Sequence, residues 1–103
     1  PVFPTQIEKV LLANEALESA CAVAIPHPYR MHVVKAYILL KDKSADESTK
    51  NKIKEELEKA CETELIPYAR PVEYEFRNEF PLTKLGKIDY RELEKIANGE
   101  KNG

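Results

Sequence analysis

The sequence has 103 residues, of which 43% are hydrophobic and 33% are charged, and its formal net charge is −2. This composition is typical of one small globular domain, whose modest core leaves little room for a deep, enclosed pocket. The surplus of Lys and Arg that nucleic-acid binding needs is missing, no apolar run approaches the ~18–20 residues of a membrane span, and no signal peptide is visible.

The first part of the sequence predicts one helix and two strands. Residues 6–13 are expected to form the helix, because Thr5 and Glu8 fit a capping box and apolar residues then recur at helical spacing. The apolar run 18–25 is typical of a strand covered on both faces, and 33–40 is rich in β-forming residues. Two prolines between these segments predict a loop, so the strands are expected to be antiparallel neighbours.

A long amphipathic helix is predicted next, with apolar residues along one side over 53–65. Asp46 or Ser48 is expected to cap its start. The charged side is interpreted as a solvated surface rather than as a docking face, because opposite charges lie four residues apart on it. The segment 67–71 has a proline at each end and predicts an extended connector.

The last part of the sequence predicts a strand, a turn and a helix. Apolar and acidic residues alternate over 72–76, which indicates a strand with one solvent-exposed face. Asp89 is expected to cap a final helix that carries Leu93, further short strands are possible near Lys87, and the residues after Asn98 are expected to fray. The order of elements predicts an α+β fold, with a small three-stranded, mainly antiparallel sheet and helices packed on it.

Cysteine and histidine offer little chemistry in this sequence. Cys21 and Cys61 lie far apart without the spacing of a zinc site, and both fall in apolar patterns. We interpret them as reduced core residues of a cytoplasmic protein. His27 and His32 lack a third ligand and are interpreted as loop residues rather than as a metal site.

The strongest functional signal is the segment 81–93, which reads PLTKLGKIDYREL. Gly86 frees the backbone of a turn directly before Lys87, and a helix anchored by Leu93 follows. This arrangement can present one positive charge to an anionic partner. A Gly-Lys pair in a turn is weak evidence when it stands alone, but here the whole segment fits the pattern P-x-T-x-x-G-K-x-D-Y-R-x-L.

This pattern resembles the C-terminal lysine motif of the adenylate-forming (AMP-binding) enzymes, a family that includes acyl-CoA synthetases, peptide-synthetase adenylation domains and luciferases. Other segments are similar to this family as well. Residues 4–11 resemble its P-x-E-I-E-x-x-L helix, 20–26 resemble its A-A-V-V-G-V-P strand, and 34–38 match V-K-A-F-V. The loop from His27 to His32 departs from the family, which usually has an acidic residue and then Gly-Glu there.

The resemblance implies how the chain is organised. Residues 1–97 would form the C-terminal lid domain of an AMP-dependent synthetase or ligase, and 98–103 would be a flexible tail. The large N-terminal adenylation domain, which carries the phosphate-binding loop and the acid pocket in this family, is expected to be absent from the chain, and so is the hinge residue that precedes the lid. The lid by itself is therefore expected to be inactive.

The resemblance also implies a two-step reaction. A carboxylic acid and ATP form an acyl-adenylate, and a thiol then takes the acyl group after the lid has rotated. Lys87 would stabilise negative charge at the α-phosphate, with Gly86 beside it on the ATP side. The implied cofactors are ATP, Mg²⁺ held mainly by the missing domain, and CoA. The implied partners are that domain, the acid, and CoA or a carrier-protein thiol.

Other interpretations stay open beside this one. Arg30 could meet a phosphate of CoA, although a surface role is favoured, whereas Asp89 and Arg91 are interpreted as a helix cap and a surface residue. The main alternative function is a stand-alone α+β protein-interaction module without catalysis. A small independent enzyme would need a nucleophile–base pair, and no such pair has persuasive spacing. The identity of the acid and of the thiol acceptor does not follow from the sequence.

Overall fold

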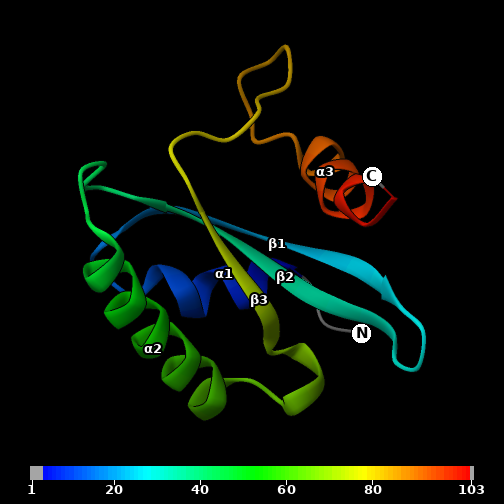
Figure 1. Ribbon diagram of the computed structural model, residues 1–103, viewed down its shortest axis with the longest axis horizontal. Coiled ribbons are helices and arrows are strands. Elements are labelled where there is room, and N and C mark those ends of the chain that lie inside the picture. The colour runs from blue at the N-terminus through cyan, green and yellow to red at the C-terminus, as the bar shows by residue number, and fades with distance from the viewer. Residues whose placement is uncertain (1–3, 103) are drawn as a thin grey trace.

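The computed structural model describes the backbone of residues 4–102 and the side chains of residues 4–99. The elements in chain order are α1 (Pro4–Leu12), β1 (Leu17–His27), β2 (Met31–Leu40), α2 (Glu47–Glu64), the short 3-10 helix η1 (Pro67–Ala69), β3 (Pro71–Arg77) and α3 (Tyr90–Asn102). The strands form one sheet in the order β1-β2-β3, as Figure 1 shows. The predicted α+β order is therefore confirmed.

The sheet is mixed, with β2 between its two partners. β1 and β2 pair antiparallel over their length, with Ala22 opposite Ala36, as expected for two strands joined by a short turn. β3 runs parallel to β2 and places Tyr74 beside Ala36. The expectation of a mainly antiparallel sheet thus holds for the longer pair. The parallel pair arises because the chain crosses over through α2 before it returns to the sheet.

Both faces of the sheet are covered, by different helices. On one face α1 and α2 pack on alternate residues of the strands; this cluster includes Ile7, Leu11, Leu57, Cys61, Ala20, Ala22, Ala36 and Ile38. On the other face α3 and the segment before it form a second cluster; this one includes Phe80, Leu93, Ala97, Cys21, Val23, Tyr37 and Leu39. Since side chains of a strand alternate between faces, the unbroken apolar run of β1 supplies both clusters, as predicted.

The turn between β1 and β2 is shorter than the sequence predicts. β1 continues to His27 and β2 begins at Met31. Pro26 fits inside β1 because this is an edge strand, where a missing backbone N–H does not interrupt pairing on both sides. The imidazole Nδ1 of His27 accepts hydrogen bonds from the backbone N–H groups of Tyr29 and Arg30, both at 3.1 Å. His27 therefore closes the turn, which the two prolines alone did not reveal.

The predicted caps of the later helices are confirmed. The Asp46 side chain accepts a hydrogen bond from Thr49 N at 2.9 Å at the start of α2. Asp89 accepts one from Glu92 N at 3.0 Å at the start of α3. α3 continues beyond Asn98, where the sequence predicts a frayed tail, to the end of the described residues.

The predicted capping box of the first helix is wrong. α1 begins at Pro4, so Thr5 lies within the helix rather than before it. The Glu8 carboxylate does not return to its own helix start; it accepts hydrogen bonds from Ala22 N and from the hydroxyl of Tyr90. Over the part of the chain that is described, no helix is both long and apolar enough to cross a membrane.

Candidate functional site

The segment between β3 and α3 projects from the body of the domain, at the top of Figure 1. Leu82 and Ile88 form an isolated antiparallel bridge within it. Thr83 N donates to the carbonyl of Lys87 at 2.7 Å, and Asp89 N donates to the carbonyl of Pro81 at 2.9 Å. The segment is therefore a small hairpin, in agreement with the short pairing expected near Lys87. We call residues 81–89 the lysine turn.

Gly86 gives the lysine turn its shape. Its N–H donates to the carbonyl of Thr83 at 2.9 Å, and its φ is +83°, in the left-handed region. A tight turn followed by a glycine of positive φ is a common hairpin connection. Lys87 comes directly after it, and its backbone N–H donates to the hydroxyl of Thr83 at 3.3 Å. The turn thus fixes the backbone of Lys87 on both sides.

The side chain of Lys87 is exposed, and among the described residues its ammonium has no ion pair and no hydrogen bond. Apolar side chains lie on the same turn: Leu85 is 87% exposed and Leu82 is 60% exposed. Exposed leucines on a projecting loop are unusual for a surface that faces only water. The lysine turn therefore offers a free cation beside an apolar tip, which fits contact with another protein surface and an anion.

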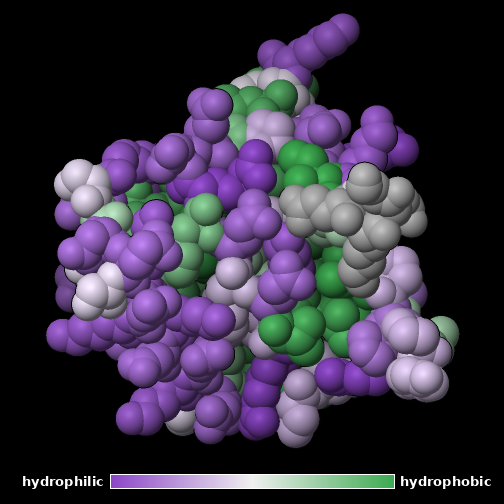
Figure 2. All heavy atoms as spheres, viewed as in Figure 1, coloured by the Kyte–Doolittle hydropathy of each residue, from purple (hydrophilic) through white to green (hydrophobic). Residues whose placement is uncertain are grey.

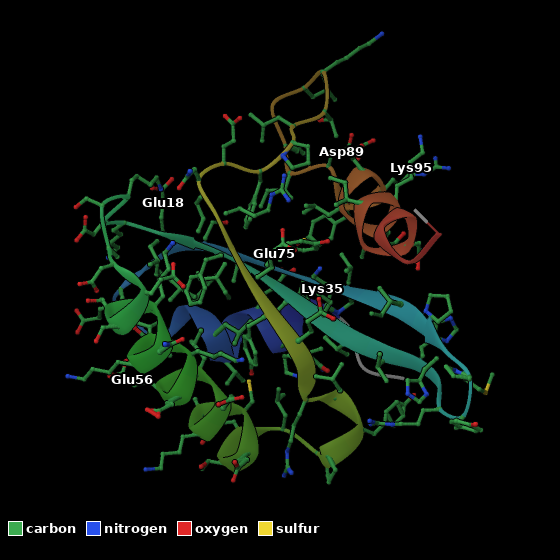
Figure 3. All side chains as sticks on the ribbon, viewed as in Figure 1. Glu18, Lys35, Glu56, Glu75, Asp89 and Lys95 are labelled. Atoms are coloured by element: carbon green, nitrogen blue, oxygen red, sulfur yellow. The ribbon has the colours of Figure 1, made fainter. Side chains whose placement is uncertain are left out.

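The base of the lysine turn is anchored in the core. Phe80, just before the turn, is 8% exposed, and Leu93, in the first turns of α3, is fully buried in the same cluster. Figure 3 shows Asp89 beside the start of α3, where it caps the helix. Lys87 is thus an exposed side chain on an anchored support, which is the arrangement that a positioned cation needs.

The glycine of the turn leads to a testable expectation. Gly86→Ala should lower the free energy of unfolding by about 1 kcal/mol, because a side chain disfavours positive φ; the added Cβ would meet no atom within 4 Å, so backbone strain is the only cost. Gly99→Ala is the control, because Gly99 lies in α3 and an added Cβ there would also meet no atom within 4 Å. This change should raise the free energy of unfolding by up to about 0.5 kcal/mol. Urea unfolding measures both, and effects of the same sign would contradict the turn geometry.

A second candidate site lies at the turn between β1 and β2. Arg30, Met31, His32 and Tyr68 line an open pocket of about 400 Å³ there. Met31 is 80% exposed and has a φ of +62°, and Tyr68 is 60% exposed. The pocket thus combines a cation with an exposed aromatic ring. The two histidines form no metal centre with these neighbours: within residues 4–99 no three His, Cys, Asp or Glu side chains gather as metal ligands.

A charged cluster that the sequence did not reveal lies on the sheet where β2 pairs with β3. Lys35 is 1% exposed, and its Nζ lies 3.0 Å from a carboxylate oxygen of Glu73 and 2.9 Å from one of Glu75. Figure 3 shows Lys35 and Glu75 side by side where β2 and β3 pair. Arg77 bonds the other oxygen of Glu75 at 2.9 Å, and the Lys35 ammonium lies 4.8 Å from the centre of the Tyr37 ring.

The electrostatics of this cluster favour the ionised forms. Burial opposes the charge of Lys35, but hydrogen bonds to Glu75 and Glu73 outweigh it and raise the pKa of the amine. Burial likewise opposes the charge of Glu75, whereas Lys35 and Arg77 lower the pKa of its carboxyl overall. The alternation of acids along 72–76 predicted a strand with one exposed face. It did not reveal that Glu73 and Glu75 lie on the same face of the sheet as Lys35, because the neighbouring strand was not known.

The charged side of α2 behaves as the sequence predicts. Most of its residues outside the apolar side are exposed, and Figure 2 shows hydrophilic side chains gathered over this helix at the left. Glu56 accepts a hydrogen bond from the Asn14 side chain at 3.0 Å, and Lys50 pairs with Glu47 at 3.5 Å. Such exposed pairs contribute little, so this side is a solvated surface.

Comparison with known proteins assigns the chain to a family. Residues 6–87, which end at the lysine of the turn, match the family described as AMP-binding enzyme C-terminal domain. A long-chain-fatty-acid–CoA ligase of Bacillus subtilis is 38% identical over 92 residues, which are 89% of this chain and 15% of that protein. A ligase of the same name from Haemophilus influenzae is 35% identical over 98% of this chain and 17% of its own length.

Solved structures agree. An anthranilate CoA ligase, AuaEII, in complex with anthranoyl-AMP superposes with a TM-score of 0.87 at 25% identity, over 99% of this chain and 19% of that one. An acyl-CoA synthetase of Brucella canis gives 0.78 at 32% identity, over 97% and 18%. The chain spans only 15–19% of the length of each of these relatives. The family match covers most of the sequence, and the chain belongs to the AMP-binding enzyme C-terminal domains.

Proposed function

We propose that this chain is the lid of an ATP-dependent acid–thiol ligase of the acyl-CoA synthetase kind, and that Lys87 serves its adenylation step. The observation that carries the proposal is the exposed, unpaired ammonium on an anchored turn. Family membership and the likeness to CoA ligases support it. The free, buried cysteines support a reducing, cytoplasmic location.

The role of Lys87 follows from the charge that develops in adenylation. A carboxylate oxygen of the acid bonds to the α-phosphorus of ATP, the bond from that phosphorus to the bridging oxygen breaks, and pyrophosphate leaves with its electron pair. The ammonium of Lys87 stabilises the negative charge that builds up at the α-phosphate in the transition state. Its long, flexible stem lets it reach from the turn into a pocket owned by the large domain.

The other implied groups belong mostly to that domain. The Mg²⁺ that accompanies ATP is proposed to be held mainly by the large domain, together with the phosphates of ATP. The exposed Leu82 and Leu85 fit the contact of the lysine turn with the large domain during adenylation. The lysine turn and the β1–β2 turn lie apart from each other in Figure 1. A lid that rotates could therefore present first one turn and then the other to the large domain.

The β1–β2 turn is our candidate for the thiol-transfer step. Arg30 and Tyr68 both line the pocket beside this turn. The guanidinium suits a phosphate of CoA, and the aromatic ring suits its base. Arg30→Ala should raise the KM for CoA about tenfold and leave adenylation unchanged. Arg91→Ala, an exposed arginine on α3, is the matched control. An unchanged KM for CoA would remove Arg30 from the proposal and favour an acceptor that is bound differently.

The experiment that tests the function uses the full-length protein that contains this domain. Exchange of labelled pyrophosphate into ATP, measured with acetate, a medium-chain fatty acid and benzoate, should depend on one class of acid, and CoA should then yield the thioester. A stand-alone interaction module predicts no exchange with any acid. That outcome, in a protein that binds ATP, would overturn the proposal.

A further inference from the structure

The carboxylate of Glu8 connects elements that are far apart in the sequence. Glu8 lies on α1 and is 8% exposed. Its Oε2 accepts a hydrogen bond from the backbone N–H of Ala22 at 2.9 Å. Both of its oxygens lie within hydrogen-bond distance of the Tyr90 hydroxyl, at 2.8 and 2.7 Å. One carboxylate thus joins α1, the edge strand β1 and the first residue of α3.

The position of the Glu8 carboxylate, at the edge of the sheet, explains how one side chain can join three elements. Ala22 lies on β1, an edge strand, and its N–H receives the partner that a further strand would otherwise supply. α1 packs on one face of the sheet and α3 on the other, so the carboxylate reaches around the edge between them. A buried carboxylate that lost its hydroxyl partner would be under-solvated, which makes this bond costly to break.

Tyr90 stands at the base of the lysine turn. It follows Asp89, whose N–H closes the turn on the carbonyl of Pro81, and it comes three residues after Lys87 in the sequence. Its ring packs at the edge of the second core cluster. Burial, and then the hydrogen bond to Glu8, raise the pKa of the Tyr90 phenol, so it stays a neutral donor at physiological pH. The hydroxyl of Tyr90 therefore fixes the start of α3 to α1. The end of the lysine turn, which directly precedes Tyr90, is held with it.

We propose that Glu8 and Tyr90 are positioning residues, which tie the lysine turn to α1 and so set where Lys87 points when the lid closes. This inference rests on the proposed function of Lys87. The lid is proposed to rotate relative to the large domain, and α1, in which the family match begins at residue 6, would rotate with it. A tie between α1 and the base of the turn lets the turn follow that motion as a rigid body. Small misplacements of a reacting group carry large losses of rate.

The test compares variants of the full-length protein. Tyr90→Phe removes only the hydroxyl, and we expect its rate of pyrophosphate exchange at saturating substrates to fall about tenfold, with the KM for ATP little changed. The matched control is Tyr74→Phe, which removes another partly buried hydroxyl, bonded to the Sγ of Cys61 at 3.5 Å on the opposite face of the sheet. Lys87→Ala is measured beside them.

Two further readouts separate positioning from simple loss of stability. Thioester formation from added acyl-adenylate and CoA should be unchanged in Tyr90→Phe, because the turn does not serve that step. The double variant Glu8→Gln/Tyr90→Phe should be slowed by less than the product of the two single effects, because both changes act on the hydrogen bond between these side chains. Melting temperatures of Tyr90→Phe and Tyr74→Phe show whether instability accounts for any difference.

The outcomes distinguish the two proposals. If Lys87→Ala slows exchange and Tyr90→Phe behaves as Tyr74→Phe does, the tie is refuted and the function of Lys87 stands. If Lys87→Ala leaves exchange unchanged, the proposed function fails first and the positioning role fails with it. A fall in both half-reactions of Tyr90→Phe would mean that the bond only maintains the fold, which also refutes positioning.

Discussion

Lys87→Ala in the full-length protein is expected to slow acyl-adenylate formation by about 10²–10³-fold, the usual loss when one preorganised donor to a developing charge is removed. The ammonium has no partner among the described residues that its loss would disturb, so folding should be unaffected. Formation of the thioester from added acyl-adenylate should keep its rate. Single-turnover measurements of the two half-reactions give both numbers.

Lys84→Ala is the matched control for this prediction. Lys84 lies on the same turn and is also exposed, but it precedes the glycine that sets the direction of Lys87. We expect its adenylation rate to stay within about threefold of the parent rate, because a screened surface charge contributes little. Similar losses in both half-reactions of Lys87→Ala, or equal losses in the two lysine variants, would contradict the assignment.

Lys35→Ala is expected to lower the free energy of unfolding by about 3 kcal/mol, since it breaks a buried ion pair and leaves a cavity under the strands. We take the lower end of the usual range because Glu73 is 53% exposed in its side chain and Glu75 keeps Arg77. Lys43→Ala is the control. Its ion pair with Glu18 has side chains 44% and 55% exposed, and such pairs are worth at most about 1 kcal/mol.

The pH dependence of the Lys35 effect has a definite sign. The pKa of Glu75 is lowered by folding, so its contribution is present above its ordinary value of 4.5 and disappears as pH falls through the folded pKa. The pKa of Lys35 is raised, so its contribution is complete below 10.5 and disappears only above that. Denaturant unfolding should therefore show the largest difference between parent and Lys35→Ala between these values, and a constant difference down to pH 2 would contradict the ion-pair account.

Features that depend on neighbouring residues could be predicted from the sequence. Asp46 and Asp89 cap helices whose first turns lie beside them, and the turn at Gly86 needs only local backbone freedom. The same holds for the strand 72–76, in which Tyr74 and Phe76 pack against a core cluster, whereas Val72 is 52% exposed. The parallel direction of β3 could also have been predicted from the sequence, because a long helical connection between neighbouring strands indicates parallel pairing.

Features that depend on distant residues could not be found in the same way. Glu8 fits a capping box with Thr5, yet its partners lie 14 and 82 residues away, and no local pattern announces either. Lys35 looks like any polar residue in a strand, and its burial follows only once β3 is known to lie beside it. The role of Lys87 was proposed from a resemblance and is still to be tested by measurement, because the pocket it would serve lies outside this chain.

The two cysteines have a practical consequence for following the proposed motion of this domain. Burial above all raises the pKa of the Cys21 thiol to about 12, and burial raises that of Cys61 as well, so the reactive thiolate is scarce at neutral pH. Maleimide dyes should therefore spare both native thiols in the folded protein. A single cysteine engineered at Leu85, which is 87% exposed, would then be the thiol of this domain that a fluorophore labels, on the lysine turn itself.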